Sequence, residues 1–110
     1  MQDEVKLQIL RDSIKRLLRR GATSHLKKIV NKAHAADLSV IFSTLSASER
    51  KRLFNMIKDV EQKGIVLSEL EEDIFLALVE DIKTDELVEI FESMPTDDVA
   101  DLLGRLEDEK

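Results

Sequence analysis

A short apolar pattern that returns about every twelve residues constrains this fold more than any other feature. Six successive segments each end on an apolar residue, with two more apolar residues three and four positions before it. The ends are separated by 12, 13, 12, 12 and 12 residues. Residues three and four apart share one face of a helix. The eighteen apolar positions are Ile41, Phe42, Leu45, Leu53, Phe54, Ile57, Val66, Leu67, Leu70, Leu78, Val79, Ile82, Ile90, Phe91, Met94, Leu102, Leu103 and Leu106.

Each unit therefore predicts a helix of about nine residues and a tight turn. One such helix cannot bury its apolar stripe alone, but stacked neighbours can, which favours an all-α solenoid or superhelix over residues 34–110. A plain helical bundle with coincidental spacing is the alternative. Pro95 ends one helix after Met94. We expect N-caps at Ser46 or Ser48, at Thr84 and at Thr96.

Residues 1–33 predict two lead-in helices packed on the repeats, so that the whole chain forms a single domain. The first, over residues 4–20, has an apolar side and a basic side, and Gly21 suits the position just after its end. The second begins after a cap at Thr23 or Ser24 and continues to about Lys32. The apolar side holds Leu7, Leu10, Ile14, Leu17 and Leu18, and the basic residues are Lys6, Arg11, Lys15, Arg16, Arg19 and Arg20.

Composition narrows the classes of function. A length of 110 residues fits one domain, and the absence of cysteine excludes disulfides and thiolate metal sites. No apolar run approaches the ~20 residues of a membrane span, and no signal-peptide pattern opens the chain. The chain also lacks nucleotide-binding and hydrolase motifs. His25 and His34 lie in different segments, and His34 fits a turn before the next helix, so neither an enzyme nor a zinc site is expected.

The net charge of −6 hides a strong asymmetry. Residues 1–58 carry 13 Lys and Arg and 5 Asp and Glu, whereas residues 59–110 carry 4 and 18. Such a division indicates two partners, an attraction between the halves, or two solvated faces. The basic first helix favours a polar cap of the solenoid, with anionic lipid or nucleic acid as alternative partners. It has no aromatic residue to stack on a base or anchor in a membrane interface.

Three aspartates follow Pro95. Asp97 and Asp98 fall in the first turn of the last helix, where the helix dipole favours acids. Asp101 lies one turn after Asp97, on the same face and away from the apolar stripe. Two exposed carboxylates at this spacing are either solvated surface or half of a site for a hard cation. Mg²⁺ needs near-octahedral oxygen coordination, so a second domain would have to complete it.

The region from His34 to Leu106 resembles the N-terminal cytosolic domain of MgtE-type magnesium transporters. The resemblance rests on H-A-A-D-L, the twelve-residue repeat and M-P-T-D-D-V-A-D-L-L, and L-R-R-G-A-T-S-H-L-K-K-I-V resembles the family's lead-in. It implies a right-handed superhelix that precedes a pair of cystathionine-β-synthase-type (CBS) domains and a membrane pore. Mg²⁺ held between acids of this domain and the CBS domains would close the pore. The matching acids are Asp97 and Asp101, with Asp98 beside them.

The resemblance also has departures. Ala35 and Ala36 replace a helix-starting proline motif, and Ile65 stands where an acid of the metal constellation is expected. The CBS pair and pore are not in this chain, which is either an excised domain or a stand-alone relative. The resemblance implies a cytoplasmic location, as the soluble part of an inner-membrane protein, and a monomeric isolated chain without a nucleic-acid partner. The main alternative is a metal-independent interaction module resembling the flagellar motor protein FliG.

Overall fold

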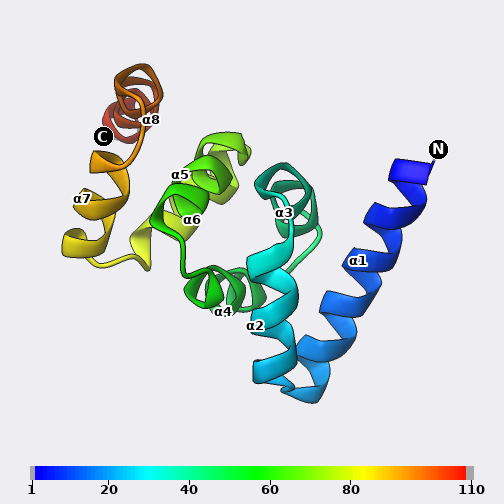
Figure 1. The fold of residues 1–110 in the computed structure, drawn as a ribbon. Helices are drawn as coiled ribbons and strands as arrows, with labels where there is room; N and C mark the ends of the chain where they lie inside the picture. Colours follow the sequence, from blue (N-terminus) through cyan, green and yellow to red (C-terminus); the bar gives the residue numbers. More distant parts are fainter. Residues whose placement is uncertain (1, 109–110) are drawn as a thin grey trace.

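The computed structural model describes residues 2–108, which form eight α-helices and no strand (Figure 1). Six helices of 8–13 residues correspond to the six predicted repeats, and a 19-residue helix and a 10-residue helix precede them. The all-α prediction is confirmed. The helices are α1 (Gln2–Arg20), α2 (Thr23–Lys32), α3 (Ala35–Phe42), α4 (Ala47–Met56), α5 (Val60–Glu69), α6 (Glu72–Glu80), α7 (Thr84–Glu92) and α8 (Thr96–Asp108).

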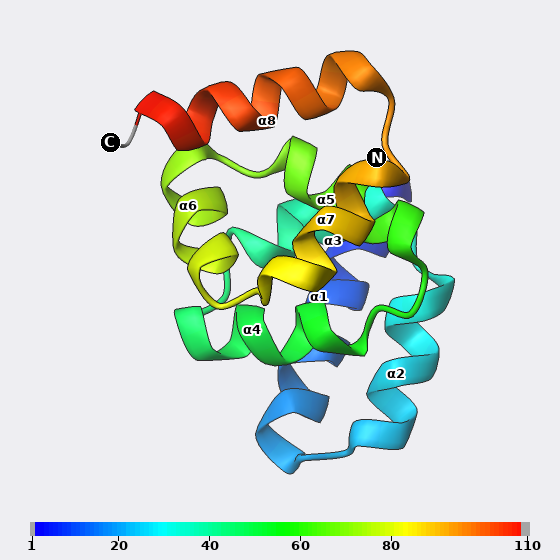
Figure 2. The same ribbon diagram turned by 90° about the vertical axis from the view of Figure 1, so that its left-hand side faces the viewer.

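Each repeat helix packs mainly on the helix two places further along the chain. One row runs α2–α4–α6–α8, a second runs α3–α5–α7, and α1 packs on α2. Because the chain alternates between the rows, it winds as a superhelix, with α1 at one end and α7 and α8 at the other (Figure 1). Figure 2, which looks at that end, shows α8 running along its top, above α6 and α7. The right-handed sense stays an expectation from the resemblance.

The apolar stripe is buried unevenly along the superhelix. The position four residues before each repeat end is buried in all six repeats, from Ile41 to Leu102. The other two positions are buried in the first three repeats but only partly in the fourth and fifth, and Leu103 is 43% exposed. At the end of the two rows, α7 packs mainly on α5 and α8 mainly on α6, and their stripes are more exposed than those of α3, α4 and α5. Buried residues of α1 and α2 belong to the same core as those of the repeats.

The helix ends test the predicted caps. Gly21 has φ 69°, and the N–H groups of Gly21 and Ala22 donate to Leu18 and Leu17, which is the expected glycine C-terminus. The predicted caps at Thr23 or Ser24, Thr84 and Thr96 are wrong. Thr23, Thr84 and Thr96 are each the first residue of their helix, and neither Ala22 nor Lys83, which precede two of them, caps with a side chain.

Ser46 is a true N-cap with a reciprocal capping box. Its Oγ accepts the N–H of Glu49 at 3.3 Å, and its own N–H donates to Glu49 Oε1 at 2.9 Å. The hydrogen bond from the Ser46 N–H is the main reason that the pKa of Glu49 lies below its ordinary value, and Lys15 and Arg52 lower it further. Because the folded-state pKa is lowered, the stabilisation by this carboxylate exists above the unfolded-state pKa and is lost as pH falls through the folded-state value.

Two substitutions distinguish the contribution of the Glu49 carboxylate to stability from that of the Ser46 hydroxyl. Glu49→Ala should lower the free energy of unfolding by about 0.3–1 kcal/mol at neutral pH, and the difference should shrink in acid, where the side chain is protonated. Ser46→Ala should cost about 1 kcal/mol at both pH values, because its hydroxyl accepts a backbone N–H whatever the state of Glu49. Urea unfolding at the two pH values measures both. A Glu49→Ala cost that does not change with pH would contradict this account.

Candidate metal-binding face

The α7–α8 turn positions the three candidate aspartates. The Pro95 carbonyl accepts the N–H groups of Asp98 and Val99, both at 3.1 Å, so the helix starts directly after the proline. Asp97 and Asp98 lie in the first turn of α8 and are exposed, as predicted. Acids at this position are stabilised by the helix dipole without any metal. The first turn alone therefore does not mark a site.

Asp101 lies one turn further on, on the outer side of α8. Its side chain is 68% exposed, whereas the adjacent Leu102 is fully buried, so the carboxylate does point away from the apolar stripe. Asp97 and Asp101 remain the pair that helical spacing places on one face. Their oxygens are open to a hydrated ion or to another domain.

Arg105 is a partner of Asp101 that the sequence analysis missed. Its Nη2 lies 3.4 Å from Asp101 Oδ2, while Nη1 donates to the Leu70 carbonyl at 3.2 Å. The guanidinium carbon also lies 5.7 Å from the centre of the Phe75 ring. Arg105 thus attaches α8 to the turn after α5 and to α6. The i, i+4 spacing of Asp101 and Arg105 could have predicted their ion pair from the sequence, but no local pattern predicts the contacts of Arg105 with Leu70 and Phe75.

Asp98, unlike the other two aspartates, lines a small open pocket. Asp98 and Glu61 both line a cavity of about 220 Å³ between α5 and the start of α8, which Asp97 and Asp101 do not line. Its apolar wall includes Ile65, Met94 and Pro95. Ile65, which replaces the expected acid, therefore faces the same pocket as Asp98 and gives it an apolar side.

Gly64 allows the close packing beneath this pocket. A Cβ at Gly64 would lie 2.6 Å from Met94 Cγ, so the missing side chain lets the end of α7 approach α5. Lys63, the preceding residue, is largely buried, forms an ion pair with Glu86 of α7, and lies 5.2 Å from the centre of the Phe54 ring. These contacts fix α7 against α5 and so determine where α8 begins.

The donor set fits part of a magnesium site. Carboxylate oxygens are the ligands that Mg²⁺ prefers. Among the side chains that the structure describes, those of residues 4–107, no three His, Cys, Asp or Glu residues gather in a way that could hold a metal ion. His34 occupies the turn before α3, as predicted, and His25 lies on α2. Asp97, Asp98 and Asp101 as metal ligands stay a prediction.

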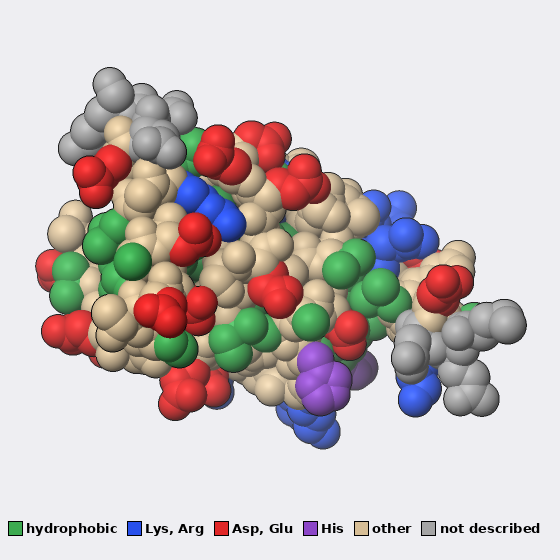
Figure 3. Space-filling view, turned by 90° about the horizontal axis from the view of Figure 1, so that it is seen from above, with side chains coloured by type: hydrophobic (Ala, Val, Ile, Leu, Met, Phe, Trp, Pro, Cys, Tyr) green, Lys and Arg blue, Asp and Glu red, His purple; other side chains and the backbone are tan. Residues whose placement is uncertain are grey.

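Charge is distributed along the superhelix as the sequence suggests. Figure 3 shows that acidic side chains predominate toward the end that holds α7 and α8, while Lys and Arg gather toward α1. The first turns of α6, α7 and α8 each contain two acids. The aspartates of α8 thus lie at the strongly acidic end of the molecule.

Comparison with known families agrees with this architecture. A model of the MgtE intracellular N domain matches residues 33–110. The chain belongs to the family of MgtE-type transporter N-terminal domains. Membership identifies it as a regulatory N-terminal domain of a magnesium transporter, a family that is not catalytic. No curated protein and no solved structure matches the chain significantly.

The family match covers only part of the chain. It covers all six repeats, including the three aspartates and Ile65, but leaves α1 and α2 outside. None of the helices within residues 2–108 combines the length and apolar character that crossing a membrane requires. The family match thus covers the six repeat helices and does not extend to the basic helix α1.

Proposed function

We propose that this domain senses intracellular Mg²⁺ by supplying half of a metal site from α8. Asp97 and Asp101 are direct or water-mediated ligands, and Asp98 is a weaker candidate. The remaining oxygens come from a CBS domain of the same or a partner chain. The observation that carries the proposal is the exposure of Asp97 and Asp101 one turn apart on the outer side of α8, whereas Leu102 of the same helix is buried.

Electrostatic repulsion between this domain and its neighbour makes their docking depend on Mg²⁺. The acidic end formed by α6, α7 and α8 repels an acidic neighbouring domain, and a divalent ion bound between them removes that repulsion. Because the ion binds the docked state better than the separated one, Mg²⁺ shifts the population toward docking. In the transporter, the docked state is the one that closes the pore. The isolated chain binds the ion weakly, because it holds only half of the ligands.

Arg105 adds a built-in competitor for the ion. Without metal, its guanidinium partly neutralises Asp101, and the same side chain is held by Leu70 and Phe75. A bound Mg²⁺ repels this cation, so the affinity of the site is lower than two free carboxylates would give. Weak affinity suits a sensor of an abundant ion.

The alternative function is a metal-independent interaction module. The observation that favours it is the pocket between α5 and α8, whose apolar wall of Ile65, Met94 and Pro95 could receive a side chain of a partner. Docking through this pocket would not require a divalent ion. Dependence on Mg²⁺ therefore distinguishes the two functions.

The test is docking of this chain to a CBS pair from an MgtE-type transporter, with Mg²⁺ or with a chelator. Mg²⁺ should strengthen association about tenfold or more, and Asp97→Asn/Asp101→Asn should remove that gain. The matched control is Asp85→Asn/Glu89→Asn, an exposed pair with the same spacing and charge on α7. Equal docking with and without Mg²⁺ would overturn the proposal and favour the adaptor function.

A further inference from the structure

The outer face of α1 combines exposed apolar residues with arginines. Val5 and Ile9 are 56% and 61% exposed, the two most exposed large apolar side chains among the described residues. Arg16, Arg19 and Arg20 follow at helical spacing on the same side and are all exposed. The opposite side of α1 buries Ile14 and Leu18 in the core. This face lies outside the region that the family match explains.

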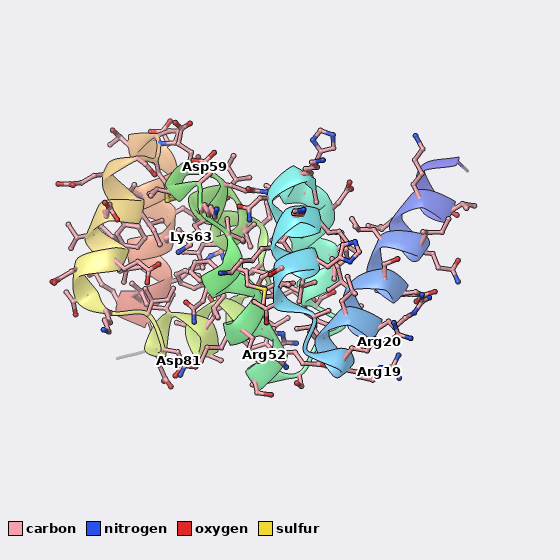
Figure 4. All side chains as sticks on the ribbon, turned by 60° about the horizontal axis from the view of Figure 1, so that its bottom comes forward. Arg19, Arg20, Arg52, Asp59, Lys63 and Asp81 are labelled. Carbon is pink, nitrogen blue, oxygen red and sulfur yellow. The ribbon has the colours of Figure 1, made fainter. Side chains whose placement is uncertain are left out.

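The structure extends the basic end of this face onto a second helix. Arg52 of α4 donates to the Leu18 carbonyl at 3.3 Å, which brings its guanidinium beside the end of α1. Figure 4 shows Arg19, Arg20 and Arg52 along one edge of the molecule. None of the arginines 16, 19, 20 and 52 forms a salt bridge within the described part of the chain. Their charges are therefore available to an external anion.

Two carboxylates lie in or beside this surface. Asp12 is on the same face of α1, and its Oδ1 is 3.5 Å from Arg11 Nε. Glu49 is held in the Ser46 capping box, close to Lys15 and Arg52. Both have a cationic neighbour, so the surface keeps its excess of positive charge.

We propose that this surface docks on the anionic headgroups of a lipid membrane. An amphipathic helix in a membrane interface places apolar side chains at the acyl boundary and cations among the phosphates. Val5 and Ile9 would lie at the acyl boundary, and the arginines at positions 16, 19, 20 and 52 would lie among the phosphates. The proposal rests on the proposed function in one respect, because a domain of a transporter is held beside a membrane.

The charge asymmetry makes the docking directional. Anionic lipid attracts the α1 end and repels the acidic end of α6, α7 and α8, which therefore points away from the bilayer. The domain can thus bind the membrane surface through its α1 end while α8 remains accessible to the CBS pair. Nucleic acid is less suited to this surface, because α1 contains no Phe, Tyr, Trp or His for stacking on bases, and exposed Val5 and Ile9 have no role on phosphates.

The test is co-sedimentation of the full chain with phosphatidylcholine vesicles, with and without phosphatidylglycerol, in chelator. Despite its net charge of −6, the protein should bind only the anionic vesicles, and binding should weaken as salt rises. Each cation contributes roughly fivefold to the binding constant. Arg16→Glu/Arg19→Glu should therefore reduce binding by more than about 25-fold, and Val5→Ser/Ile9→Ser should reduce it on the same vesicles.

Lys58→Glu/Lys83→Glu is the matched control, since it makes the same change in net charge at exposed positions away from α1. Equal loss in both pairs would mean a net-charge effect and would overturn the proposal. Absence of vesicle binding, or tighter arginine-dependent binding to duplex DNA at the same salt, would also overturn it. Asp97→Asn/Asp101→Asn should leave vesicle binding unchanged, so failure of the metal site and failure of the membrane surface give separate results.

Discussion

Phe54→Ala is expected to lower the free energy of unfolding by about 3–5 kcal/mol. The ring is 1% exposed on α4, in the middle of the stack, and removing it leaves a cavity that rigid neighbouring helices cannot fill. It also removes the aromatic face on which the Lys63 ammonium lies, and Lys63 connects α5 to Glu86 of α7. Chemical denaturation with circular dichroism measures the loss.

Phe91→Ala is the matched control for Phe54→Ala. Phe91 occupies the same position of its repeat but is only partly buried, on the outlying helix α7. Its truncation should cost less than half as much, because part of the ring already contacts water. Equal costs would show that the burial gradient along the superhelix is wrong.

Leu102→Ala and Leu103→Ala should differ sharply although the residues are neighbours. Leu102 is fully buried and its truncation should cost about 2–5 kcal/mol. Leu103 is 43% exposed at the open side of α8, so its truncation should cost about 1 kcal/mol or less. Thermal or urea unfolding of the two variants gives the comparison.

The two leucine variants also bear on the proposed site. Loss of Leu102 should loosen α8 and with it the positions of Asp97 and Asp101, whereas loss of Leu103 should leave them in place. A large cost at Leu103 would mean that α8 packs in a different rotation about its axis. In that case the aspartates would face elsewhere.

The repeat allowed the fold to be predicted well from sequence. The apolar positions at each repeat end identified six helices and their inner faces, and on α8 Leu102 is indeed buried while Asp101 is exposed. Periodicity does not say how many neighbours a helix has, so the partial exposure of Phe91 and the exposure of Leu103 could not be predicted. That property depends on packing across the whole stack.

The wrong caps have a local explanation that the sequence contained. Ser46 is followed three residues later by Glu49, which completes a capping box, and it is a true cap. Thr23, Thr84 and Thr96 are followed at that spacing by Leu26, Leu87 and Val99, which cannot return the hydrogen bond. The acid three residues on was thus the stronger signal than the hydroxyl alone.

The sequence predicted which aspartates of the candidate site share a face, but not which charged side chain lies beside them. Spacing placed Asp97 and Asp101 on one face, yet Arg105 is oriented toward Asp101 by the Leu70 carbonyl and the Phe75 ring. Those contacts join residues about 30–35 positions apart in the chain, and no local pattern reports them. Similarly, only the packing of α5 against the end of α7 and the α7–α8 turn shows that Ile65 and Asp98 line one pocket.

The central claim is that α8 holds half of a magnesium site, and an NMR titration of the chain with Mg²⁺ at constant ionic strength tests it most directly. A half-site on α8 should give saturable amide shifts confined to residues 96–102, which vanish in Asp97→Asn/Asp101→Asn and persist in Asp85→Asn/Glu89→Asn. Shifts spread across α6, α7 and α8, and equal in all three proteins, would mean counter-ion screening of an acidic surface and would contradict the claim.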